Sequence, residues 1–244
     1  MDEPSTGSAA AASLELGQVG RALGACAVYF TVVMLAMGLL RVPPLSDGVV
    51  PNVEGGVLAM LFGVAALLVY AAYFPPPVRW LQRGVLGRAA ATYAVFLLVW
   101  VPLAMIVYPW VLRHLDAPLA AQPTLRYLAE PSLVRSTPRS ITVIAMACLI
   151  VPLAEEILFR GYVQEMLKRF MPTTTAVVVA AVLFGLAHDV EYAVPIGFLG
   201  LLFGVLKERC GCLAVSVFAH ALHNTITVVL VICFPQILVW LYGS

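Results

Sequence analysis

The chain has 244 residues, of which 62% are hydrophobic and only 11% are charged, and its formal net charge is +1. A soluble domain carries about 25% charged residues, and this chain has a mean hydropathy of +0.97. These figures exclude an ordinary soluble domain and predict an all-α polytopic protein of the lipid bilayer, with no basic field for a nucleic-acid partner.

The N-terminus is polar and opens with acids, in "MDEPSTGS". A cleaved signal peptide carries basic residues at this place, so the first apolar segment is expected to be retained. We therefore predict a short polar N-terminal segment, residues 1–18, followed by a single integral membrane domain, residues 19–244.

About 20 apolar residues are needed to cross the ~30 Å hydrocarbon core as a helix. Seven segments are predicted to do so, approximately Val19–Leu40, Val53–Phe74, Ala89–Leu112, Ser140–Val163, Thr174–His188, Tyr192–Leu206 and Cys212–Cys233. An eighth crossing requires the last one to be split into Cys212–Thr225 and Ile226–Leu241. We disfavour it, because the end of the chain is too short to cross after Pro235 breaks the helix.

Basic residues in alternate connections favour a cytoplasmic N-terminus, by nine to five. The fourth segment then runs from the outside inwards. Of the 14 Lys and Arg residues only Lys168 and Lys207 are lysines, and the chain is rich in alanine. Such usage is typical of a bacterium with GC-rich DNA, so the expected location is the plasma membrane, as a multi-pass protein of a bacterial inner membrane.

The stretch "LAEEILFRGY" places Glu155 and Glu156 within the fourth segment. Glu155 lies roughly 12 Å from its predicted end at 1.5 Å per residue, where a charged side chain costs about 2.5–3.5 kcal/mol. Arg160 follows Glu156 by four residues and shares its helical face, whereas Glu155 points about 100° away. A structural ion pair beside a snorkelling acid is the plainer interpretation. Two adjacent acids with a deep arginine favour a functional site.

Two later segments supply further polar groups at a similar predicted depth. Phe184 and His188 are four residues apart at the end of the fifth segment. In the seventh, "FAHALHNTIT", His220 and Asn224 share a face and His223 is rotated away from it. An acid, two imidazoles and an amide suit hydrolysis, because a carboxylate with an imidazole can deprotonate water while an imidazole and an amide stabilise an oxyanion.

Three motifs resemble the signatures of one family. "EEILFR" matches EExxxR, "FGLAH" matches FxxxH and "HALHN" matches HxxxN. Together and in this order they resemble the CAAX protease and bacteriocin-processing family, the intramembrane group that includes the Ras-converting CAAX endopeptidase. The resemblance covers about residues 141–231, which we expect to be the catalytic core.

The resemblance implies an intramembrane endopeptidase with a set of catalytic residues in the three motifs. Glu155 and His188 would activate the attacking water. His220 and Asn224 would form the oxyanion hole. The implied substrate is a membrane-anchored protein or peptide, and nothing in the sequence selects its identity or the bond that is cut.

The resemblance implies an orienting role for three further residues of the motifs. Glu156, counted with the catalytic set, would orient the site together with Arg160, and Phe184 is also counted as site-orienting. His223 falls between motif positions and receives no role.

Relatives of this family have been described both as metalloproteases and as glutamate proteases. Glu155, His188 and His220 could provide a zinc site with an open position for water. The chain has no H-E-x-x-H motif, and asparagine is a poor zinc ligand. We therefore favour a metal-free glutamate mechanism without a cofactor, and keep zinc as the alternative.

Two other classes of function compete with the protease. A proton or cation transporter would also place acids in a helix bundle, but it predicts broken helices and internally symmetric halves, which the sequence does not show. A non-proteolytic scaffold or immunity factor of the same family is the stronger alternative. A further hypothesis is that Gly197, Gly200 and Gly204 permit a lateral opening in the sixth segment.

Overall fold

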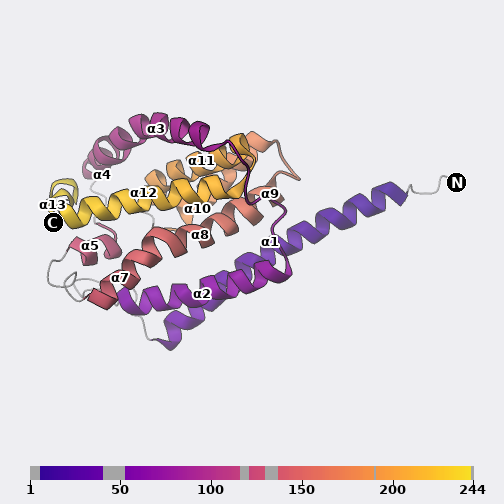
Figure 1. Cartoon of the computed structure of the whole chain (residues 1–244), viewed down its shortest axis with the longest axis horizontal. Helices are drawn as coiled ribbons and strands as arrows, with labels where there is room; N and C mark the ends of the chain where they lie inside the picture. Colours follow the sequence, from indigo (N-terminus) through magenta and orange to yellow (C-terminus); the bar gives the residue numbers. More distant parts are fainter. Residues whose placement is uncertain (1–5, 41–52, 116–120, 130–136, 190, 243–244) are drawn as a thin grey trace.

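The computed structural model describes residues 6–40, 53–115, 121–129, 137–189 and 191–242, and these residues are helical apart from their connections (Figure 1). The α-helices are α1 (Thr6–Leu39), α2 (Val53–Tyr73), α3 (Leu86–Pro102), α4 (Tyr108–His114), α5 (Pro123–Ala129), α7 (Thr137–Ala145), α8 (Val151–Glu156), α9 (Gln164–Leu167), α10 (Thr173–Leu186), α11 (Ala193–Cys210), α12 (Leu213–Cys233) and α13 (Gln236–Tyr242). Three π-helical segments lie between them, η1 (Leu103–Val107), η2 (Met146–Ile150) and η3 (Ile157–Val163). The prediction of an all-α fold is confirmed for this part of the chain.

Each of the seven predicted segments coincides with helix. Five helical stretches are long and apolar enough to cross a membrane, namely Leu16–Leu39, Gly55–Tyr73, Gly87–His114, Ser140–Leu167 and Leu213–Cys233. The protein is thus a multi-pass membrane protein. The crossings predicted for α10 and α11 stay predictions, because α10 has only 14 residues and α11 ends in the charged stretch Lys207–Arg209. The split that an eighth crossing requires is absent from α12, which is continuous from Leu213 to Cys233.

The first helix begins much earlier than the sequence predicted. α1 starts at Thr6 and runs through most of the segment that we expected to be merely polar. Its early part is rich in alanine, the strongest helix former, so the helix continues outside the apolar stretch. Figure 1 shows this part of α1 projecting beyond the other helices.

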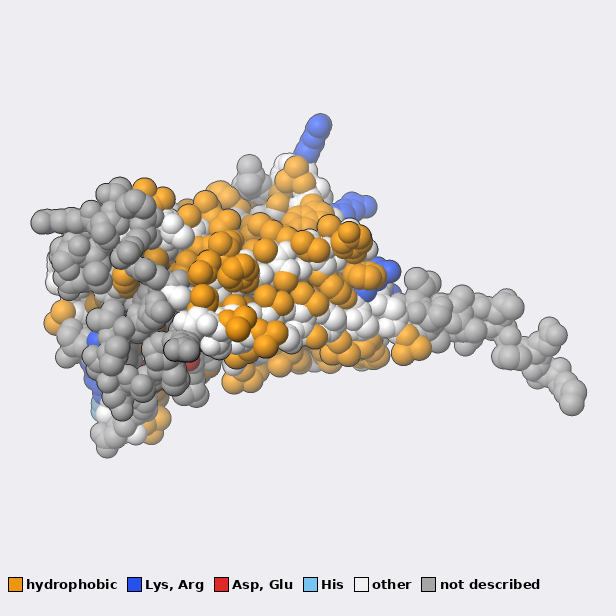
Figure 2. Space-filling model, turned by 90° about the horizontal axis from the view of Figure 1, so that it is seen from below, with side chains coloured by type: hydrophobic (Ala, Val, Ile, Leu, Met, Phe, Trp, Pro, Cys, Tyr) orange, Lys and Arg blue, Asp and Glu red, His pale blue; other side chains and the backbone are white. Residues whose placement is uncertain are grey.

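The outer surface of the bundle is apolar over its middle. Figure 2 shows hydrophobic side chains over the middle of the visible face, with several Lys and Arg side chains at the end from which α1 projects. Large apolar side chains such as Leu98 and Leu35 are 77% and 62% exposed. A soluble protein rarely exposes an apolar surface of such extent, so this surface faces lipid.

The fourth predicted segment forms one long helical rod made of α7, η2, α8, η3 and α9 in succession. Pro152 lies in the first turn of α8 and has no N–H to donate, and the wider η2 turn precedes it. The rod extends to Leu167 rather than Val163, so Glu155 lies roughly 18 Å from the end of the rod. π-Helical turns are rare and frequently mark functional sites.

The helices of the core pack closely through small residues. α1 and α2 form a hairpin against α8 and η3, and α10 packs along α11. A side chain at Gly185 of α10 would collide with the carbonyl oxygen of Ala193 in α11. Such contacts bring the backbones together, and they bring α10, α11 and α12 against the rod at the level of the two glutamates.

Candidate active site

The carboxylate of Glu156 is fully buried, and it contacts one side chain of the rod and one of α12. Its Oε1 lies 3.0 Å from Nη1 of Arg160, and the two side chains are 0% and 1% exposed. The same oxygen lies 3.0 Å from Nδ1 of His220 on α12. The structure thus has the Glu156–Arg160 pair that the spacing predicted, with His220 as an additional partner.

The guanidinium of Arg160 joins three helices. Its Nη2 donates to the carbonyl oxygen of Gly200 on α11 at 2.8 Å, and its central carbon lies 4.4 Å from the centre of the Phe184 ring on α10. An arginine over an aromatic face gains a cation–π attraction, which is larger away from water. Phe184 therefore packs against the arginine, and its site-orienting role stays a prediction.

Glu155 points in a different direction from Glu156, and two imidazoles lie near its carboxylate. Its Oε1 is 3.9 Å from Nε2 of His188, and its Oε2 is 3.7 Å from Nε2 of His220. These distances are too long for direct hydrogen bonds. They are within the range at which one water can bridge two polar groups.

The other ring nitrogen of each histidine fixes the tautomer. Nδ1 of His188 is 2.9 Å from the carbonyl oxygen of Phe184, which can only accept a hydrogen bond. Nδ1 of His220 faces the Glu156 carboxylate, which also accepts. Each Nδ1 therefore carries the proton, so in the neutral rings both Nε2 lone pairs face Glu155. Three acceptors then converge on one place, which suits a shared proton, a water or a cation.

His188 lies in a different local structure from the predicted one. α10 ends at Leu186, and His188 follows in the turn rather than on the helix. Its backbone N–H still bonds to the Gly185 carbonyl at 3.1 Å. The contact between its imidazole and the Phe184 carbonyl, together with this turn, directs the ring back towards the rod.

Asn224 shares the face of His220 towards the rod, whereas His223 points to another helix. Nδ2 of Asn224 donates to the carbonyl oxygen of Ala147 in η2 at 2.9 Å. His223 points to α3, where its ring lies 4.6 Å from that of Trp100 and its Nδ1 is 3.3 Å from the Tyr93 hydroxyl oxygen. The prediction that His223 is rotated away from the motif face is confirmed.

The donors around Glu155 are of the type that zinc prefers, but their spacing is wide. Two ligands of a tetrahedral zinc lie roughly 3.4 Å apart, against 3.9 and 3.7 Å here. Within the described ranges, no group of three or more His, Cys, Asp or Glu side chains is spaced to hold a metal ion. In this arrangement the three side chains are spaced more widely than the ligands of a zinc ion.

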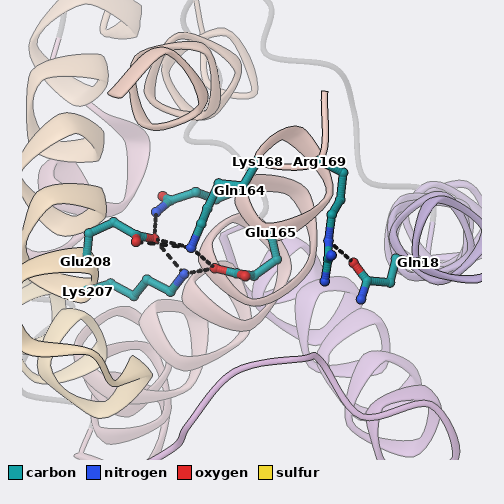
Figure 3. A network of polar contacts seen from close by, with 7 residues as sticks. All are labelled: Gln18, Gln164, Glu165, Lys168, Arg169, Lys207 and Glu208. Atoms are coloured by element: carbon teal, nitrogen blue, oxygen red, sulfur yellow. Dashed lines mark hydrogen bonds and ion pairs between the residues drawn. The ribbon is translucent and has the colours of Figure 1, made fainter. Parts of the chain in front are cut away.

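A second group of polar side chains lies at the C-terminal end of the rod, and it was not predicted from the sequence. Figure 3 shows side chains of α9, the turn after it and α11 converging there. We name this group the end cluster; its members are Gln164, Glu165, Lys168, Lys207 and Glu208. The signal was present in the i, i+3 spacing of Glu165 and Lys168 and in the charges that end α11.

The end cluster is a dense network of charge-assisted hydrogen bonds. Glu208 accepts from Gln164 and from Lys207, both at 2.8 Å, and from Lys168 at 3.0 Å. Glu165 accepts from Lys168 at 3.0 Å and also from Lys207. Burial raises the pKa of the Glu208 carboxyl, but the hydrogen bond and charge of Lys207 outweigh it and hold that pKa below its ordinary value.

Comparison with known protein families gives a match over the part of the chain that contains all three motifs. The sequence model of the family described as Type II CAAX prenyl endopeptidase Rce1-like matches residues 137–226. No curated protein and no solved structure matches the chain. The matched range begins with α7 and includes every candidate site residue. Residues 137–226 are therefore similar to the Rce1-like endopeptidases of the CAAX protease family.

Proposed function

We propose that this protein is an intramembrane endopeptidase that hydrolyses a peptide bond of a membrane-associated protein or peptide. The observation that carries the proposal is the position of the Nε2 atoms of His188 and His220, 3.9 and 3.7 Å from the carboxylate oxygens of Glu155. The family match supports a protease of this general class. The location is proposed to be a bacterial inner membrane.

In the proposed reaction, one water is held between Glu155 and His188. Glu155 removes a proton from this water as its oxygen attacks the scissile carbonyl carbon. The proton passes to the leaving nitrogen as the C–N bond breaks, which releases an amine and a carboxylic acid. Glu156 and Arg160 act by holding His220 through its Nδ1.

The oxyanion of the intermediate is proposed to be stabilised from α12. An asparagine amide has two N–H donors, and Asn224 uses one of them for the Ala147 carbonyl. The second is available to a substrate oxygen. His220 can donate from Nε2 only when it carries a second proton, so it would contribute as the imidazolium. Preorganised donors of this kind are worth about 10²–10³ in turnover each.

The proposal is tested by comparing the N- and C-terminal peptides of membrane proteins from host cells that carry the wild type, Glu155→Gln or His188→Ala. His114→Ala is the matched control, because His114 is an exposed histidine on α4. We expect the same termini to disappear in both site variants and to persist in the control, at equal protein abundance. If Glu155→Gln is stably inserted and every cleavage continues, the protease proposal is wrong.

The same experiment decides between the protease and the non-proteolytic scaffold. Identical peptides from all four strains would favour the scaffold or immunity factor. For a purified and active protein, treatment with a chelator tests the metal-free mechanism. We expect turnover to persist, whereas a loss that zinc alone restores would establish the metalloprotease.

A further inference from the structure

The rod and α11 run in the same direction and touch through polar groups at every turn. The side chains on the rod are spaced by four residues, and so are their partners on α11. The contacts, in order from the site, are Arg160 with Gly200, Gln164 with Gly204 and Glu208, and Lys168 with Glu208. One continuous line of contacts therefore joins the candidate active site to the end cluster.

Two glycines let these helices approach but do not fix their relative height. A Cβ at Gly204 would lie 2.9 Å from Oε1 of Gln164, and one at Gly200 would lie 3.2 Å from Nη2 of Arg160. At these two positions α11 leaves room only for backbone. Between them the buried ring of Phe203 lies 5.5 Å from the central carbon of Arg160. A helix surface with few side chains offers few ridges to interlock, so polar contacts can add to the packing of Phe203 in fixing the height of α11.

The end cluster supplies such contacts. Gln164 is fully buried, and its amide group donates to Glu208. Lys207 is 6% exposed and bridges Glu208 of its own helix to Glu165 of the rod. A slide of α11 by one residue is about 1.5 Å, which would break these hydrogen bonds together.

The same slide would also disturb the candidate active site. The Gly200 carbonyl is a hydrogen-bond acceptor of Arg160, at 2.8 Å. Arg160 in turn lies 3.0 Å from Glu156, which holds His220. A displacement of Gly200 is therefore passed to a histidine that faces Glu155.

From this line of contacts we infer that the end cluster is a positioning device for the active site. It fixes the height of α11 against the rod, and through the Gly200 carbonyl it holds Arg160 and so His220. Its residues touch neither substrate nor reacting atoms. The inference rests on the proposed function for its effect on turnover, but the geometry that it predicts can be measured without a substrate.

The test replaces Gln164 by methionine, which has a similar length and no amide, in the full chain in detergent. The readout is the side-chain ¹⁵N spectrum of the histidines, in which the four residues are assigned by single substitutions. The Nδ1 resonance of His220 reports its hydrogen bond to Glu156. Arg169→Gln is the matched control, because Arg169 bonds to Gln18 of α1 at the same end of the rod and not to α11 (Figure 3).

We expect the His220 resonance to shift in Gln164→Met and to stay unchanged in Arg169→Gln. With a substrate in hand, kcat should fall about 10- to 100-fold at nearly constant KM, as a misplacement near 1 Å produces. Glu208→Gln, which keeps an acceptor for Gln164, should retain more turnover than Glu208→Leu.

Each outcome decides a separate question. An unchanged His220 resonance in Gln164→Met overturns the positioning role, whatever the turnover does. A shifted resonance in a protein that cleaves nothing leaves the positioning role in place and counts against the proposed function. If Gln164→Met does not fold, Lys207→Met takes its place in the same spectrum, and an unchanged resonance there also overturns the inference.

Discussion

The candidate active site and the end cluster are both built on the rod, and each contains two glutamates, yet their charges balance differently. The end cluster matches Glu165 and Glu208 with two lysines. In the active site, Arg160 is the only permanent cation in contact with the acid pair among the described residues. The end cluster thus has as many basic as acidic side chains, while the site has one carboxylate more than it has fixed positive charges.

The difference shows what each region is suited for. A buried charge without compensation costs several kcal/mol, so the balanced cluster is a stabilising structure. The surplus carboxylate is Glu155, and its two ion-pair contacts in the described structure are with histidines, whose charge depends on a proton. An intramembrane acid of this kind is by default a functional group, and proton transfer is the function that an acid between two imidazoles can perform.

The largest expected effect is on catalysis at the surplus carboxylate. Glu155→Gln should lower turnover by about 10²–10⁴-fold, the usual contribution of a general base, with little loss of stability, because it removes no fixed ion pair. The measurement is turnover of the substrate identified from the cellular peptides, beside thermal unfolding in detergent. A variant that unfolds readily but turns over normally would assign Glu155 a structural role instead.

The next largest effect is expected at the buried ion pair of Glu156 and Arg160. Glu156→Gln leaves Arg160 buried without a carboxylate and should cost about 3–5 kcal/mol in the free energy of unfolding. Replacing both, as Glu156→Leu with Arg160→Met, should recover much of that stability without restoring turnover. Unfolding by denaturing detergent measures the two variants. Equal stability of the wild type and Glu156→Gln would show that the pair contributes nothing.

A smaller effect separates the glycines of α11. Gly200→Ala places a Cβ 2.9 Å from Phe184 and 3.2 Å from Nη2 of Arg160, and overpacking of this kind costs about 1–3 kcal/mol. Gly197→Ala is the matched control, because its Cβ would meet the Ala181 carbonyl oxygen at an ordinary 3.5 Å. We expect reduced stability and turnover only at Gly200. Equal losses at both positions would instead favour the lateral opening proposed for the whole glycine stretch.

The smallest effect is the pH dependence of the end cluster. The pKa of Glu208 is held below its ordinary value of 4.5, so its contribution to stability is present above that value and is lost as the pH falls below it. Although burial opposes it, Glu165 and Glu208 raise the pKa of Lys168 above its ordinary 10.5, so its contribution is lost only at higher pH.

The cluster should therefore stabilise the protein evenly between about pH 5 and pH 10. The measurement is the unfolding temperature of the wild type and of Glu208→Gln over this range. We expect a constant difference that shrinks in acid. A difference that changes near neutral pH would mean that the cluster titrates there, and then a neutral pH dependence of turnover could not be assigned to the site alone.

The sequence predicted much of this architecture because its signals are local. Apolar segments of sufficient length indicated the seven longest helical stretches, the i, i+4 spacing indicated the Glu156–Arg160 pair, and the rotation of His223 off the motif face followed from helical geometry. The short helices α5 and α13, the π-helical turns of the rod and the end of α10 before His188 were not predicted. Those depend on competing hydrogen bonds of similar strength, which neighbouring helices decide.

Hydropathy and spacing along one helix are properties of the chain alone, so the sequence already indicated the membrane class, the long helices and the three motifs. Which side chains of different helices contact each other depends on the tertiary structure. It placed His220 between the two glutamates, put the Gly200 carbonyl on Arg160 and gathered the end cluster from two separate helices. Those contacts join residues 40 to 65 positions apart, and their pairing depends on how the helices pack and at what height, which no periodicity in the sequence encodes.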